Sequence, residues 1–127
     1  MRLQLMSVFV EDQDKALDFY TRVLGFMKKQ DMPLGQFKWL TVVSPEEPEG
    51  PELLLEPNDN PAASTFQKAI HAQGIPLAAF AVQDTQREYE RMKALGVKFT
   101  TEPTQSGPTV FAVFDGTCGN LVQIFQA

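Results

Sequence analysis

A duplicated pattern constrains this chain more than any other feature of its sequence. The first copy opens with an apolar strand, then has an acidic residue, a helix that ends at a glycine, and three further strands. The second copy repeats this order, so that Asp12 corresponds to Asp84 and Gly25 to Gly96. A repeat on this scale constrains architecture far more than a single motif does. The sequence predicts an α+β fold of two tandem βαβββ modules within one domain of residues 1–127.

Local signals set the expected bounds of each copy. Residues alternate between the two faces of a strand up to Val10, and Asp12 can then cap a helix. We expect copy one over residues 1–57, a linker helix within 58–74 that begins at Asn60 and Pro61, and copy two over 75–127. Turns are expected at 31–35 and 104–108, and an exposed acidic loop at 44–51.

Composition excludes several classes of partner. The net charge is −5, and the chain lacks the clustered basic residues that bind phosphates, so we expect no nucleic-acid partner. One cysteine cannot form an internal disulfide. No apolar stretch reaches the roughly 20 residues that span a bilayer, and the first residues do not resemble a signal peptide. We therefore expect a cytoplasmic protein with no membrane partner.

Two motifs and the duplication together resemble the vicinal oxygen chelate superfamily. The motifs are Phe19-Tyr20 with Leu24-Gly25-Phe26 in the first helix, and Gly119-Asn120-Leu121 before the last strand. This superfamily contains glyoxalase I, the bleomycin-resistance proteins and the extradiol dioxygenases, and the resemblance covers nearly the whole chain. It implies that each copy curls into half of an open barrel with pseudo-twofold symmetry around a cavity. It also implies a homodimer.

The resemblance implies four positions for a metal centre, one on the first strand and one on the fourth strand of each copy. These positions fall on Leu5, Glu56, Leu77 and Gln123. Leucine has no lone pair, and one carboxylate with one amide is a poor site for zinc, nickel or iron. The single histidine, His71, lies on the linker helix, outside these positions. We expect no metal and no cofactor, which disfavours the metal-dependent activities of the superfamily.

Few other groups could carry chemistry. Cys118 lies in a tight loop with no evident base beside it, so we interpret it as a turn residue. Glu56 is the only candidate for a catalytic role. A buried carboxylate is costly without a partner, and pseudo-symmetry suggests Gln123 as its donor. Glu56 is therefore either an anchor for a ligand or a structural residue satisfied by Gln123 and water.

The alternation along the strands predicts which residues face the cavity. The ligand-binding candidates are the polar and aromatic residues on the concave side, with Trp39 in one wall and Phe111 in the opposite wall. They are Glu56, Gln123, Trp39, Phe111, Ser7, Phe9 and Phe125. This favours a metal-free protein that binds a small aromatic or cationic molecule. One alternative is a metal-dependent lyase or dioxygenase with other ligands, and another is a non-catalytic dimeric interaction module.

Overall fold

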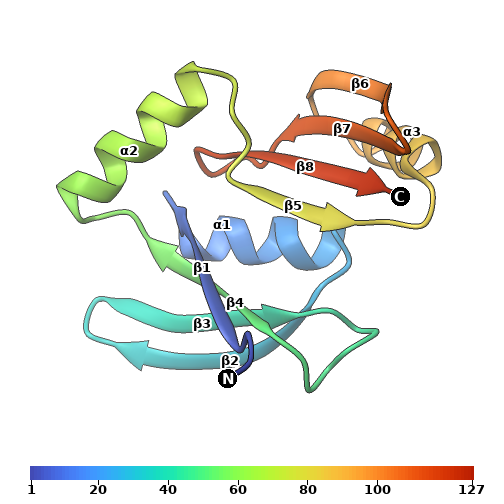
Figure 1. Ribbon diagram of the computed structural model, residues 1–127. Coiled ribbons are helices and arrows are strands. Elements are labelled where there is room, and N and C mark those ends of the chain that lie inside the picture. The colour runs from blue at the N-terminus through green and yellow to red at the C-terminus, as the bar shows by residue number, and fades with distance from the viewer. The chain divides into compact units, whose positions relative to one another are not determined.

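The computed structural model describes residues 1–127 and divides into two compact units, Met1–Gln67 and Lys68–Ala127. Each unit holds one four-stranded sheet (Figure 1). The elements of the first unit are β1 (Leu5–Val10), α1 (Gln13–Asp18), the π-helical turn η1 (Phe19–Val23), β2 (Met27–Leu34), β3 (Phe37–Val43) and β4 (Glu52–Pro57). Helix α2 (Pro61–Ala72) follows, and then β5 (Ala78–Ala81), α3 (Thr85–Ala94), β6 (Phe99–Ser106), β7 (Thr109–Asp115) and β8 (Leu121–Gln126).

The first module has the strand order β1-β4-β3-β2, in which β1 and β4 are parallel and the other neighbours antiparallel. Asp12 caps α1 as predicted, because its Oδ1 accepts a hydrogen bond from the backbone N–H of Lys15 at 3.1 Å. Helix α1 and η1 cover one face of the sheet. The side chains buried there are Val8, Val10, Leu40, Val42 and Leu55 from the strands and Ala16, Phe19, Tyr20 and Val23 from the helical segment.

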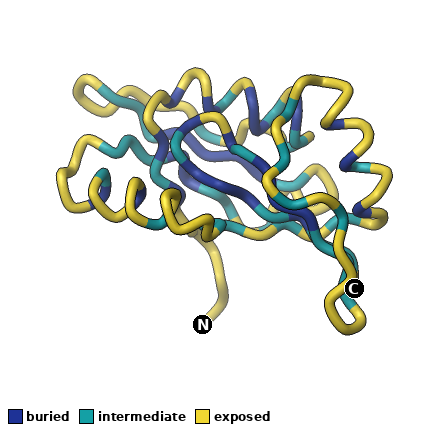
Figure 2. The backbone as a smooth tube through the Cα atoms, turned by 90° about the horizontal axis from the view of Figure 1, so that it is seen from above, coloured by how far each residue is buried: buried dark blue, intermediate teal, exposed yellow.

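The second module repeats the arrangement with the order β5-β8-β7-β6. Asp84 caps α3 by accepting from the N–H of Arg87 at 3.1 Å, the same contact that Asp12 makes in the first module. Met92 on α3 is buried, as are Phe114 and Val122 on the sheet. Figure 2 shows that burial is concentrated in the middle of the strands, while the loops are mostly exposed. The predicted α+β fold of two βαβββ modules is confirmed.

Two of the predicted turns are wrong in extent. Strand β2 continues through Asp31, Met32 and Pro33, and the turn is confined to Gly35 and Gln36. Proline is tolerated there because β2 is the edge strand of its sheet, where one face of the backbone needs no partner. Strand β6 likewise continues to Ser106, and its turn lies at 107–108.

Helix α2 begins as predicted, since Asn60 Oδ1 accepts from the N–H of Ala62 at 2.9 Å and Pro61 is the first helical residue. The boundary between the compact units falls inside this helix. Gln67, only 2% exposed, donates to the carbonyl of Phe9 at 2.9 Å and accepts from Asn58 Nδ2 at 2.7 Å. The first half of the expected linker helix is therefore part of the first module.

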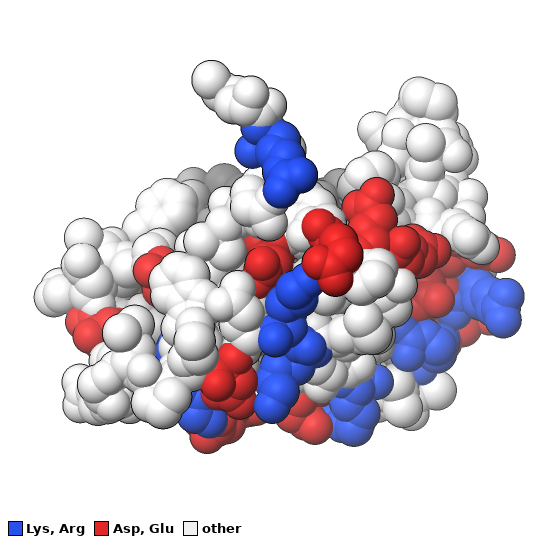
Figure 3. All heavy atoms as spheres, turned by 90° about the horizontal axis from the view of Figure 1, so that it is seen from below, with Lys and Arg blue, Asp and Glu red and all other residues white.

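The distribution of charge agrees with the acidic composition. On the face shown in Figure 3, basic side chains stand in small groups with acidic side chains beside them, and they form no continuous basic patch. Lys28 and Lys29 are exposed on the edge strand β2, and Lys29 Nζ bonds to Glu49 in the acidic loop at 3.2 Å. None of the helices is long and apolar enough to cross a membrane.

Candidate functional site

Strands β3 and β4 pair over only a short stretch. Their partners are Thr41 with Leu54 and Val42 with Leu53, and pairing stops there although both strands continue. If the ladder went on in the same register, Trp39 would lie opposite Glu56 and Lys38 opposite Pro57. Proline has no N–H to donate, so it cannot complete that last pair. A cavity lies at this interrupted end of the ladder.

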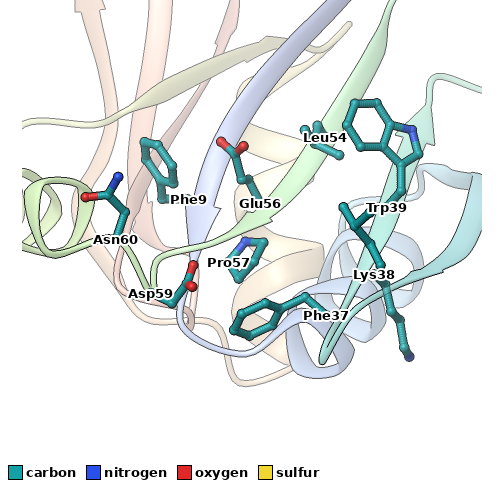
Figure 4. Close-up of a pocket in the computed structure, with 10 residues that line it drawn as sticks. Phe9, Phe37, Lys38, Trp39, Leu54, Glu56, Pro57, Asp59 and Asn60 are labelled. Atoms are coloured by element: carbon teal, nitrogen blue, oxygen red, sulfur yellow. The ribbon is translucent and has the colours of Figure 1, made fainter.

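The cavity has a volume of about 440 Å³, within the range of small-molecule sites, and all the residues around it belong to the first module. Its lining consists of Phe9, Leu34, Phe37, Lys38, Trp39, Leu54, Glu56, Pro57, Asp59 and Asn60. Figure 4 shows Trp39 and Glu56 carried by different strands, with the Leu54 side chain between them. Three aromatic rings therefore surround a space that also contains carboxylates.

The structure brings together three of the predicted ligand-binding residues, namely Phe9, Trp39 and Glu56. Phe9 lies directly beside Glu56 because β1 and β4 pair at these residues. Ser7 lies two residues before Phe9 on β1, so its side chain points to the same face of the sheet. It is nevertheless exposed and does not line the cavity.

The other three predicted residues belong to the second module. Phe111 pairs with Phe125, and Gln123 pairs with Val113 on one side and Ala79 on the other. Alternation along β8 places Gln123 and Phe125 on the same face of their sheet. Their contact with a ligand, and that of Gln123 with Glu56, stay predictions.

The cavity is acidic in character. Glu56 and Asp59 contribute carboxylates, and Lys38 is the one lining residue with a positive charge. Lys38 Nζ lies 2.5 Å from Asp14 Oδ1 on α1, and this bond raises the pKa of the Lys38 ammonium. Figure 4 shows the Lys38 side chain extending away from Glu56 and Asp59. The ammonium is thus engaged outside the cavity, and the carboxylates lack a cation within it.

Glu52 shows what a structurally satisfied carboxylate looks like on the same face of β4. Its Oε1 accepts from Thr41 Oγ1 at 2.7 Å and from Gln30 Nε2 at 2.6 Å. The bond from Thr41, followed by that from Gln30, lowers the pKa of Glu52, and this effect outweighs its desolvation. Glu56, half-buried at the other end of the strand, makes no such bond within the first module. Of these two glutamates, Glu56 is the one that is free to meet a ligand.

Sequence reasoning missed Asp59, Leu34 and Pro57 as lining residues. The run Pro57-Asn58-Asp59-Asn60-Pro61 indicated only the start of a helix. The proline that ends strand pairing, followed by an acidic residue in the adjoining loop, was the available signal. It identifies a cavity only once Pro57 is known to lie beside β3.

The pairing registers correct one predicted metal position. Asp12 and Asp84 are equivalent caps, so Ser7 and Ala79, five residues earlier, are equivalent too. Ser7 pairs with Leu54 and Ala79 pairs with Gln123. The counterpart of Gln123 is therefore Leu54, and the prediction that Glu56 occupies this position is wrong. Glu56 lies two residues further along its strand, at the place equivalent to Phe125.

The corrected set does not fit a metal centre. Leu5, Leu54 and Leu77 offer no donor atoms, which leaves the amide oxygen of Gln123 as the only one. No cluster of three or more His, Cys, Asp or Glu side chains suited to a metal is present in the chain. His71 is exposed on α2, and Cys118 is buried in the loop before β8. We derive no chemical step through a metal.

Comparison with known proteins agrees with this architecture. YurT of Bacillus subtilis (strain 168) is 56% identical over 126 residues, which cover 99% of each chain. The solved structure of UcmS2 is 34% identical with a TM-score of 0.82, over 98% of this chain and 97% of UcmS2. TnmS3, an antibiotic binding protein from Streptomyces sp. CB03234, shares the fold at 24% identity and a TM-score of 0.76, over 99% and 95% of the two chains. Residues 2–124 match the family model, and the chain belongs to the Glyoxalase/Bleomycin resistance protein/Dioxygenase superfamily.

Proposed function

We propose that this protein binds a small molecule carrying an aromatic ring and a positive charge, without a metal and without catalysis. The observation that carries the proposal is the position of Glu56. Its carboxylate has no protein partner in the first module, and it lines a cavity together with the rings of Phe9, Phe37 and Trp39. A carboxylate in such surroundings favours a cationic ligand, because the ligand replaces the water that the carboxylate would lose.

The rings provide the rest of the expected affinity. A flat aromatic ligand can stack against Trp39, and a ligand cation near its face gains a further attraction from the ring electrons. Asp59 adds a second negative charge at the exposed side of the cavity. TnmS3, which shares the fold, is described as an antibiotic binding protein, and this supports the proposal. The leucines at three of the four superfamily positions support a metal-free site.

Calorimetric titration with three naphthalene compounds tests the proposal. Naphthylmethylammonium, naphthylmethanol and naphthoate share a ring system and differ in charge. In buffer with EDTA we expect the ammonium compound to bind one per chain, the alcohol at least about tenfold more weakly and the carboxylate not measurably, a difference of about 1.4 kcal/mol or more. Equal affinity for all three would show that Glu56 does not select charge.

The alternatives predict different outcomes. A metal-dependent lyase or dioxygenase would show metal-dependent turnover of a substrate that is lost in EDTA. An interaction module without a ligand would bind none of the three compounds. The proposal also keeps the predicted homodimer and cytoplasmic location, and sedimentation velocity tests the first of these.

A further inference from the structure

Gln13 connects the two strands whose pairing is interrupted at the cavity. It is the first residue of α1 and is only 9% exposed. Its Nε2 donates to the carbonyl of Lys38 at 2.8 Å and to the carbonyl of Leu55 at 2.9 Å, and its Oε1 accepts from the N–H of Lys38 at 3.0 Å. Both donor hydrogens and one acceptor site of the amide are used. The side chain thus behaves like a peptide group inserted between β3 and β4.

The two residues that Gln13 holds are next to the cavity in sequence. Lys38 precedes Trp39 on β3, and Leu55 precedes Glu56 on β4. Side chains alternate between the faces of a strand, so Gln13 enters from the face that α1 covers while Trp39 and Glu56 belong to the other face. The Gln13 amide therefore lies between β3 and β4 on the face that α1 covers, and the cavity lies between the same strands on the opposite face.

In the second module, the residue equivalent to Gln13 is Thr85, which follows the cap Asp84. Thr85, the residue after the cap, donates through Oγ1 to the carbonyl of Val110 at 2.8 Å. Strands β7 and β8 then pair continuously from Val110 with Gln126 to Asp115 with Leu121. The Thr85 side chain bonds to the backbone of β7 alone, and its backbone N–H donates to Oε1 of Gln126 on β8 at 2.6 Å. The ladder that is interrupted in the first module is complete in the second.

We infer that Gln13 is a positioning residue that keeps β3 and β4 apart and so sets the opening between Trp39 and Glu56. Without its amide, Leu55 would have a buried carbonyl with no partner and Lys38 two part-buried backbone groups with none, and such groups are costly. Apart from the Lys38 carbonyl, which would face Pro57, these groups can regain partners if β3 pairs with β4 as β7 pairs with β8. Loss of Gln13 therefore closes the cavity. The effect on a ligand rests on the proposed function, whereas the effect on the strands does not.

Fluorescence of the ligand-free protein provides the first test, because Trp39 is the single tryptophan of the chain. In Gln13→Leu, we expect the acrylamide quenching constant of Trp39 to fall to about half of its original value as the strands close into a densely packed arrangement. Gln13→Asn keeps a buried amide that is too short to reach both strands. Its quenching constant should fall by the same amount, and this variant replaces Gln13→Leu in the test if Gln13→Leu does not fold.

Thr85→Val is the matched control in the second module. It also removes a side-chain hydrogen bond to a strand carbonyl at the start of a helix, but it should leave the quenching of Trp39 unchanged. We expect Gln13→Leu to lower the affinity for naphthylmethylammonium by about tenfold or more, and Thr85→Val to change this affinity by less than about twofold.

The outcomes separate the inference from the proposed function. If the original protein binds no naphthalene compound, the proposed function fails, and quenching alone still decides the role of Gln13. Unchanged or increased quenching in both Gln13→Leu and Gln13→Asn would overturn the inference. An equal fall in Thr85→Val would overturn it too, because the effect would then be one of general destabilisation.

Discussion

The two modules share their order of elements and the acidic cap of their helix, yet only the first interrupts its central ladder. In the second, β7 and β8 pair without interruption from Val110 with Gln126 to Asp115 with Leu121. In the first, β3 and β4 stop after Thr41 with Leu54, and Gln13 bonds to both strands beyond that point. In this duplicated fold, the interrupted backbone pairing and the cavity occur in the same copy, and the Gln13 side chain satisfies backbone groups of both strands there.

The modules also differ in charge at equivalent strand positions. Glu52 and Glu56 on β4 correspond to Leu121 and Phe125 on β8, as the pairing with β1 and β5 shows. At these two positions the first sheet carries carboxylates and the second sheet carries apolar side chains. The polar site and the interrupted ladder therefore occur in the same copy, which is the arrangement expected if the first module has become specialised for a ligand.

The largest expected difference between the modules concerns stability. Gln13→Ala should lower the free energy of unfolding by about 2 kcal/mol, because it removes the partner of several buried backbone groups, whereas Thr85→Val should cost about 1 kcal/mol. Urea denaturation of both variants measures this. Equal losses would mean that the amide of Gln13 contributes no more than an ordinary capping contact.

Removal of an aromatic ring should weaken ligand binding in the first module but not in the second. Trp39→Ala should weaken naphthylmethylammonium by about tenfold, or about 1.4 kcal/mol, because the stacking surface is lost. Phe111, at the equivalent position of β7, is the matched control, and Phe111→Ala should change the affinity by less than about twofold if the cavity of the first module is sufficient. If Phe111→Ala lowered the affinity as much as Trp39→Ala, the second sheet would also contribute to ligand binding.

Two glutamates of one strand allow a finer comparison. Glu56→Gln should weaken the ammonium compound by about 1 kcal/mol and leave naphthylmethanol unaffected, since only the charged contact is removed. Glu52→Gln should have little effect on affinity, because its carboxylate is already held by Thr41 and Gln30. Calorimetry with both compounds distinguishes the two roles. An unchanged affinity in Glu56→Gln would make Glu56 structural.

The smallest expected effect is on the acid stability that Glu52 provides. Its folded pKa lies below its ordinary value of 4.5, so its contribution is present above about that pH and is lost as the pH falls through the folded value. Thr41→Val removes the largest cause and should shift the pKa of Glu52 upward, which reduces this acid-sensitive contribution. A carboxyl titration followed by NMR measures the shift, and an unaltered titration would contradict the role of Thr41.

Much of the fold could be predicted because its signals are local. The caps at Asp12 and Asp84, the helix start at Asn60 and Pro61, and the alternation of β1 all depend on residues close in sequence. The turn at 31–35 was misplaced because proline reads as a break unless the strand is known to be an edge.

The site was predicted less completely because it depends on pairing between distant strands. Phe9, Trp39 and Glu56 could be placed on one face from alternation alone. The equivalence of Leu54 with Gln123 required the registers of β1 with β4 and β5 with β8, and counting along the sequence missed it by two residues. The sequence led to no prediction for Gln13, because nothing local reveals its bonds to residues 25 and 42 positions away in the chain.

NMR mapping can locate the proposed metal-free site for a cationic aromatic molecule in the first module. Naphthylmethylammonium is titrated into isotope-labelled protein in buffer with EDTA, and shift changes are followed at every backbone amide and at the Trp39 indole. We expect saturable shift changes concentrated at Phe9, Trp39, Glu56 and Asp59. Changes confined to β7 and β8, or none at any concentration, would contradict it.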